Sequence, residues 1–123
     1  MNDTILDSEI ILIDENNNPL PFQNLMKKNK SNLYKIILFD VLQLNNINLS
    51  KNTLLNRKNL LTETFHDSSS IEIIKYHLMK INSVQDIETL YKKAIQDKCE
   101  GLMIKDSTSS YNFTEKRKDW MKV

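Results

Sequence analysis

The single glycine of this 123-residue chain, Gly101, does most to limit how the chain can fold. It follows a segment in which apolar residues recur at helical spacing, and it precedes the apolar run 102–104. Glycine adopts a positive φ without steric penalty, so it is typical of the point where a helix ends. The sequence therefore predicts a helix-to-strand junction at Gly101, with Glu100 held at a fixed place beside it.

Length, charge and cysteine content limit the class of protein. A chain of 123 residues can form one modest domain or part of one. Its net charge of +1 creates no overall field that would attract nucleic acid or an anionic membrane, so such binding depends on local Lys and Arg clusters. A single cysteine cannot form an internal disulfide, and no apolar run is long enough for a signal sequence or a membrane span. We expect an intracellular protein that has no membrane partner.

Two segments rich in β-branched residues, 5–14 and 34–41, are predicted to be strands. The pair Asn45-Asn46 predicts a hairpin tip after the second strand. Alternation in the first strand places Glu9 on the face of Ile11. Glu9 thus either lies on an exposed strand start or is a carboxylate that needs a cation or hydrogen-bond donors. From the residues alone, Phe39 in the second strand is a core residue.

The remaining pattern predicts two helices and two further strands. Apolar residues at helical spacing predict a short helix over 54–65, with Arg57 and Lys58 on its exposed face. Alternation predicts a strand over 71–81, and an apolar stripe after a capping-box sequence predicts a helix over 84–98. A fourth strand is predicted over 101–105, beginning at Gly101. The two histidines share no metal-ligand spacing with each other or with the cysteine and are interpreted as structural.

Four segments in this order and spacing carry a family resemblance, and together they span nearly the whole chain. They are Ile-Leu-Asp-Ser-Glu at 5–9, Phe-Asp-Val-Leu-Gln-Leu-Asn at 39–45, Cys-Glu-Gly-Leu-Met-Ile-Lys at 99–105, and 111–122 ending in Trp-Met-Lys. The chain resembles ATP-dependent DNA ligases of the eukaryotic and archaeal replicative type. This resemblance implies an α+β fold, a partial nucleotidyltransferase (ATP-grasp-like) adenylation domain with a mainly antiparallel sheet and packed helices.

The resemblance also implies an activity. Such ligases seal nicks in duplex DNA through enzyme–AMP and DNA–AMP intermediates, with ATP and Mg²⁺ as cofactors, during DNA replication, repair and recombination. It implies nicked duplex DNA as the partner of the intact enzyme and, in a eukaryote, a nuclear location. A related RNA ligase or capping-type nucleotidyltransferase shares this chemistry but fits the segments around Phe39 and Glu100 less well.

Site residues follow from the resemblance by position. The residue matching Glu9 contacts the ribose and helps to hold a divalent metal, and the aromatic ring matching Phe39 stacks on adenine. The residue matching Glu100 serves the metal. Lysines matching Lys105 and Lys122 face the ATP phosphates. Stacking and metal neutralisation of phosphoryl charge are the physical reasons for these residue types.

Basic residues outside these positions are candidates for contacts with DNA or phosphate. They are Arg57, Lys116 and Arg117. Residues 115–117 read Glu-Lys-Arg where the family usually shows Lys-Arg-Ser, so one charge is reversed or the register is displaced by one residue.

One departure from the family pattern limits the activity expected of the chain. The nucleophilic lysine of these ligases lies in a Lys-x-Asp-Gly motif, and no such motif occurs in the 123 residues. We expect residues 1–123 to be part of one adenylation domain, with the nucleophile motif upstream and an oligonucleotide-binding-fold domain downstream. The isolated chain is then predicted to be inactive. The alternative is a noncatalytic remnant that binds nucleotide or DNA.

Overall fold

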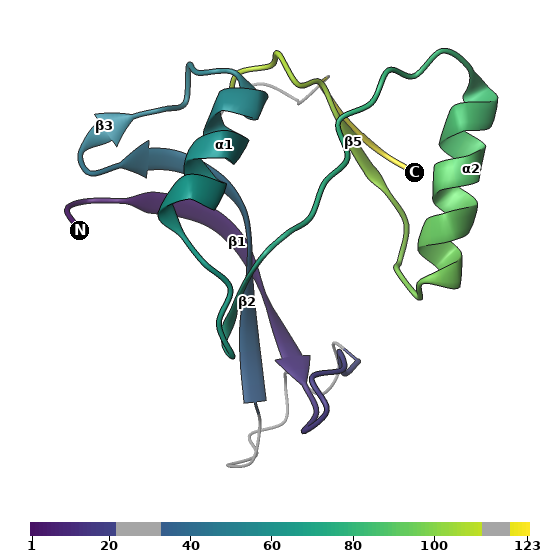
Figure 1. Ribbon diagram of the computed structural model, residues 1–123, viewed down its shortest axis with the longest axis horizontal. Coiled ribbons are helices and arrows are strands. Elements are labelled where there is room, and N and C mark those ends of the chain that lie inside the picture. Colours follow the sequence, from purple (N-terminus) through teal and green to yellow (C-terminus); the bar gives the residue numbers. More distant parts are fainter. Residues whose placement is uncertain (22–32, 112–118) are drawn as a thin grey trace.

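The computed structural model describes residues 1–21, 33–111 and 119–123, and Figure 1 shows their arrangement. The described part of the chain forms six strands and two helices, in the order β1-β2-β3-α1-β4-α2-β5-β6. The strands are β1 (Ile5–Ile13), β2 (Leu33–Leu44), β3 (Ile47–Asn48), β4 (Ile71–Ile73), β5 (Met103–Lys105) and β6 (Trp120–Lys122). The helices are α1 (Leu54–Thr64) and α2 (Val84–Gln96). Neither helix is long and apolar enough to cross a membrane. The predicted α+β class is confirmed.

The larger sheet is built around β2. β1 pairs with β2 in antiparallel register, from Ile5 opposite Gln43 to Ile13 opposite Leu33. β3 continues β2 through a hairpin whose tip residues, Asn45 and Asn46, have φ of 49° and 70°. Asparagine tolerates this left-handed conformation, which two-residue hairpin turns require. The predicted hairpin tip and both predicted strands are therefore confirmed.

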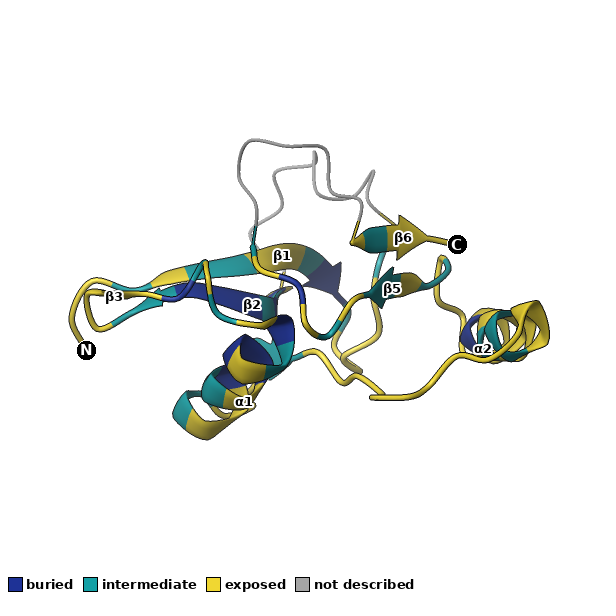
Figure 2. Cartoon of the chain, turned by 90° about the horizontal axis from the view of Figure 1, so that it is seen from above, coloured by how far each residue is buried: buried dark blue, intermediate teal, exposed yellow. Residues whose placement is uncertain are grey.

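A hydrophobic core lies between this sheet and α1. Its buried members are Leu38, Val41, Leu49 and Leu61. Figure 2 shows the buried residues concentrated on β2 and on the side of α1 that faces it. α1 begins at Leu54 because Thr53 caps it, with its hydroxyl accepting a hydrogen bond from the Asn56 amide. The core thus joins α1 to β2, the two elements that carry the buried charged residues Asp40, Arg57 and Lys58.

A β-bulge interrupts the pairing of β1 with β2 at Phe39. Asp7 lies opposite Asp40 while Ser8 lies opposite Leu38, so Phe39 is an extra residue on β2. An extra residue bends its strand and redirects the side chain. The bulge therefore gives Phe39 a direction that a regular strand would not.

β4 is shorter than the strand predicted over 71–81, which is a correction. It pairs in parallel with Ile36–Leu38 and ends at Ile73, and the Ile74 amide then bonds to the Leu38 carbonyl. The bulge at Phe39 comes at the next residue of β2, so the ladder cannot continue. Residues 74–82 instead cross the molecule without regular structure toward α2.

The smaller sheet pairs β5 with β6 in antiparallel register, and α2 precedes it (Figure 1). α2 confirms the predicted helix, and its N-terminus has the predicted capping box between Ser83 and Asp86. The prediction of a positive φ at Gly101 is wrong: φ is 62° at Lys98, and Gly101 has no positive φ. Glycine is required at 101 for space, because a Cβ there would collide with the backbone carbonyl oxygen of Val123.

We expect Gly101→Ala to lower the free energy of unfolding by about 1–3 kcal/mol, because the methyl group meets backbone that cannot rotate away. Urea denaturation followed by circular dichroism measures the change. Cys99→Ala, an exposed site two residues earlier, serves as the control and should be nearly neutral. Equal stabilities of Gly101→Ala and wild type would contradict the steric explanation.

Candidate functional site

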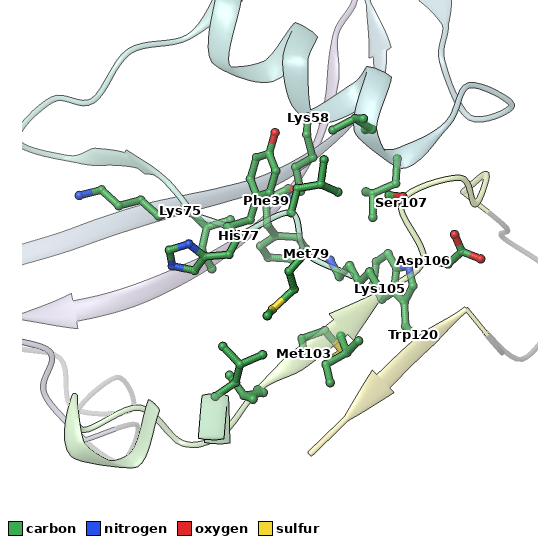
Figure 3. Close-up of a pocket in the computed structure, with 18 of the residues that line it drawn as sticks. Phe39, Lys58, Lys75, His77, Met79, Met103, Lys105, Asp106, Ser107 and Trp120 are labelled. Carbon is green, nitrogen blue, oxygen red and sulfur yellow. The ribbon is translucent and has the colours of Figure 1, made fainter. Parts of the chain in front are cut away.

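A cavity of about 730 Å³ lies between the two sheets and the segment that follows β4 (Figure 3). Its walls are mostly apolar, with three lysines and two carboxylates among them. The described lining residues are Glu9, Phe39, Leu54, Leu55, Lys58, Ile74, Lys75, Tyr76, His77, Leu78, Met79, Ile81, Leu90, Leu102, Met103, Ile104, Lys105, Asp106, Ser107 and Trp120. An apolar cavity with a few charged groups is typical of a small-molecule site.

An aromatic and cationic cluster lies on one side of the cavity. The Lys105 ammonium lies 3.7 Å from the Trp120 ring centroid and 5.3 Å from that of Phe39. Lys105 and Trp120 are cross-strand partners on β5 and β6, and the bulge delivers Phe39 from β2. The ammonium is attracted to the electron-rich faces of both rings. This cluster presents a flat aromatic surface and a positive charge to the same space.

A second lysine, Lys58 of α1, lines the cavity with most of its side chain buried. Its ammonium donates a hydrogen bond to the Phe39 carbonyl and lies 5.6 Å from the Tyr76 ring centroid. Burial lowers the pKa of Lys58 to about 8, and the positive charge of Lys105 contributes to the lowering. The two ammonium groups therefore face the same cavity closely enough to repel each other.

The residue before Lys58 forms a buried ion pair, which corrects the prediction that α1 exposes Arg57 and Lys58. Both residues are buried, at 0% and 6% exposure. Arg57 donates from Nε and Nη2 to the two carboxylate oxygens of Asp40, at 2.8 and 3.0 Å. Its Nη1 donates to the backbone carbonyl of Asn52 at 2.7 Å. Since the guanidinium is enclosed in this way, nothing in the geometry supports the predicted phosphate contact by Arg57.

The loop after β5 is attached to the first turn of α1. The amides of Leu54 and Leu55 donate to the carbonyls of Ser109 and Ser107, at 2.8 and 3.0 Å. Helix N-terminal amides have no partners within the helix, so the loop supplies them. Farther along, the Tyr111 hydroxyl donates to Asp7 of β1 at 2.8 Å. These bonds hold β5, and with it Lys105, against the larger sheet.

Of the five residues predicted to bind nucleotide or metal, three line the cavity and two lie outside its described lining. Glu9, Phe39 and Lys105 line the cavity. Lys122 is exposed and outside the described lining, but it lies opposite Met103 and on the same face of β6 as Trp120. Glu100 is exposed and also outside that lining. The roles of these residues stay predictions. Lys116 and Arg117 lie outside the described residues.

No metal-binding cluster can be assigned from side chains alone. Across residues 1–21, 33–111 and 119–123, no group of three or more His, Cys, Asp or Glu side chains is placed to hold an ion. Two carboxylates line the cavity, Glu9 and Asp106. Hydrogen bonds from Thr108 lower the pKa of Asp106, so this carboxylate is ionised at neutral pH.

Sequence reasoning did not identify several lining residues. Trp120 stands in a segment that carries the resemblance, but no role was predicted for it. The apolar residues of 74–81 were predicted to belong to a strand, whereas Tyr76, His77 and Met79 line the cavity. The apolar residues of this stretch were the available signal in the sequence. Whether they form a strand or line a cavity depends on the bulge that ends β4.

Comparison with known proteins links this geometry to one family. The family model described as ATP dependent DNA ligase domain matches residues 1–123. DNA ligase 1 of Drosophila melanogaster is 28% identical over 97% of the chain, and DNA ligase 4 of Coccidioides immitis is 33% identical over 97%. The chain spans only 17% and 13% of these two relatives.

Solved structures show the same fold. A mycobacterial DNA ligase D, complexed with ATP and MES, matches with a TM-score of 0.73 at 19% sequence identity. The match covers 97% of this chain and 37% of that chain. The predicted adenylation-domain fold is thereby confirmed.

Replacing Asp40 with Asn should lower the free energy of unfolding by about 3–5 kcal/mol, because a buried Arg57 cation then lacks its counter-charge. Chemical denaturation at neutral pH measures the loss. Asp3→Asn, at an exposed position, is the control and should change stability little. A loss no greater than in Asp3→Asn would contradict the importance of the pair.

Lys58 should titrate near pH 8, which NMR of its side-chain ε-carbon measures directly. The unfolded chain holds this proton up to its ordinary pKa of 10.5, so between about pH 8 and 10.5 the unfolded state binds more protons. The contribution of Lys58 to stability therefore rises with pH in that window and is constant below it. Comparing wild type with Lys58→Met at pH 7 and 9.5 isolates this contribution. A midpoint near 10.5 would contradict the lowered pKa.

Proposed function

This chain belongs to the ATP-dependent DNA ligase domain family, and from that membership we propose that it supplies nucleotide contacts for AMP transfer in the sealing of nicked duplex DNA. The aromatic and cationic cluster of Phe39, Lys105 and Trp120 is the observation that carries the proposal. A purine needs an aromatic surface to stack on, and the attached phosphates need positive charge. The aromatic surface and the positive charge lie in one cavity.

Phe39 is the base-stacking residue in this proposal. Its ring is half-buried and lines the cavity, whose walls also include the apolar residues Met79 and Met103 (Figure 3). Lys105 and Lys75 add positive charge to the same walls, where the triphosphate of ATP would lie, whereas the Lys58 ammonium is bonded to the Phe39 carbonyl. Lys122, on the face of β6 that carries Trp120, would join them once a nucleotide is bound.

In this proposal Glu9 is the carboxylate that holds Mg²⁺. Mg²⁺ prefers oxygen ligands and is commonly bound through one or two carboxylates together with substrate phosphates, which fits a cavity lined by few acids. The ion would supply positive charge that stabilises the transferring phosphoryl group. Glu100, the other predicted ligand, lies just before Leu102 of the lining and would act from the cavity edge.

The chain itself is proposed to bind nucleotide without accepting AMP. The Lys-x-Asp-Gly motif of the family is absent from residues 1–123, so the covalent step needs a lysine from outside them. Incubation of the purified chain with radiolabelled ATP and Mg²⁺ should leave the protein unlabelled. A stable protein–AMP adduct would show that a lysine of this chain is a nucleophile.

Phe39→Ala should weaken ATP binding by about 5- to 150-fold, the loss that corresponds to about 1–3 kcal/mol of base stacking. Quenching of Trp120, the one tryptophan of the chain and a residue of the cavity lining, reports the binding. Tyr34→Ala removes an exposed aromatic ring from the same strand outside the described lining and is the control. Equal ATP affinities of Phe39→Ala and wild type would contradict the stacking role.

A further inference from the structure

The position of the Phe39 ring depends on a local irregularity of β2. Phe39 is the residue that has no partner in the register between Asp7–Asp40 and Ser8–Leu38. A bulged residue loses its place in the hydrogen-bond ladder, and its backbone needs another partner wherever water is excluded. Something other than the sheet must therefore hold this peptide.

Lys58 provides that partner. Its ammonium donates a hydrogen bond to the Phe39 carbonyl, while the Tyr76 ring covers it from the segment that follows β4. Lys58 is 6% exposed, so the bond lies in a site largely shielded from water, where an unsatisfied carbonyl is costly. The preceding residue, Arg57, binds the side chain of Asp40. One turn of α1 thus holds two consecutive residues of β2 through two different cations.

We propose that Lys58 is a positioning residue, which fixes the bulge and thereby sets the Phe39 ring for base stacking. This inference rests on the proposed function where it concerns the base. Lys58 then acts on the nucleobase through Phe39, whereas the exposed Lys75 of the same cavity can act only as a charge near the phosphates. Replacing Lys58 and replacing Lys75 should therefore have different effects on the affinity for a ligand that has no phosphate.

Adenosine and ATP separate the two roles. If Lys58 positions the ring, Lys58→Met should weaken both ligands by the same factor, about 5- to 10-fold, which is part of the stacking contribution. Lys58→Arg keeps a cationic donor and should recover most of the affinity for both ligands. Lys75→Met is the matched control, and it should weaken ATP while leaving adenosine unchanged. Trp120 fluorescence measures all four proteins.

A readout without ligand makes the inference independent of nucleotide binding. The ring-proton resonances of Phe39, and its nuclear Overhauser contacts with the Lys105 side chain, should change in Lys58→Met and return toward wild type in Lys58→Arg. Unchanged Phe39 resonances in Lys58→Met would overturn the proposal, as would a loss of ATP affinity with normal adenosine affinity. If the wild-type chain binds neither ligand, the proposed function fails, and the ring resonances still decide the role of Lys58.

A folding defect would not obscure the result. Cooperative thermal unfolding by circular dichroism checks each variant first. If Lys58→Met does not unfold cooperatively, Lys58→Gln replaces it, because a glutamine amide is a neutral donor. Wild-type Phe39 resonances in Lys58→Gln would support positioning through the hydrogen bond, and resonances displaced while Lys58→Arg remains normal would show that the cationic donor is required. Displacement in both Lys58→Gln and Lys58→Arg would overturn the proposal.

Discussion

The buried ion pair between Asp40 and Arg57 is the interaction on which the rest of the structure depends. Asp40 belongs to β2, Arg57 to α1, and a further bond from Arg57 reaches the Ser109 carbonyl in the loop after β5. Two charges withdrawn from water are tolerated only when their geometry is good and their remaining donors are satisfied. Here both carboxylate oxygens and every guanidinium nitrogen have partners. One side chain therefore joins the larger sheet, the helix and the loop that leads from the smaller sheet.

The arrangement of the cavity walls depends on the junction made by Asp40, Arg57 and Ser109. Phe39 precedes Asp40, Lys58 follows Arg57, and Lys105 lies near the start of the loop that contains Ser109, so each partner in the junction is close in sequence to a cavity residue. By contrast, α2 has one buried residue, Ala94, and contributes only Leu90 to the lining. The walls that carry aromatic and cationic groups thus belong to the part of the molecule held by the buried pair.

Local signals in the sequence predicted the elements well, and long-range contacts account for the rest. Asn45-Asn46, the capping box before α2 and the β-branched strands act over a few residues, so their pattern was sufficient. The burial of Arg57 depends on Asp40, seventeen residues away, and no helical periodicity reveals it. The early end of β4 and the direction of Phe39 both come from a bulge, which has no signature in this sequence. Gly101 was correctly placed at a junction, but for a reason that only its contact with Val123 reveals.

The bonds from Ser107 and Ser109 to the first amides of α1 have a consequence for how the chain is made. Residues 54 and 55 leave the ribosome some fifty residues before the carbonyls that satisfy them. Contacts this distant in sequence form late, because a long loop must close before they stabilise anything. The first turn of α1 is therefore completed only after β5 has been synthesised, and until then Arg57 lacks the Ser109 part of its binding site. The first turn of α1 and the loop after β5 therefore reach their final hydrogen bonding together despite their separation along the chain.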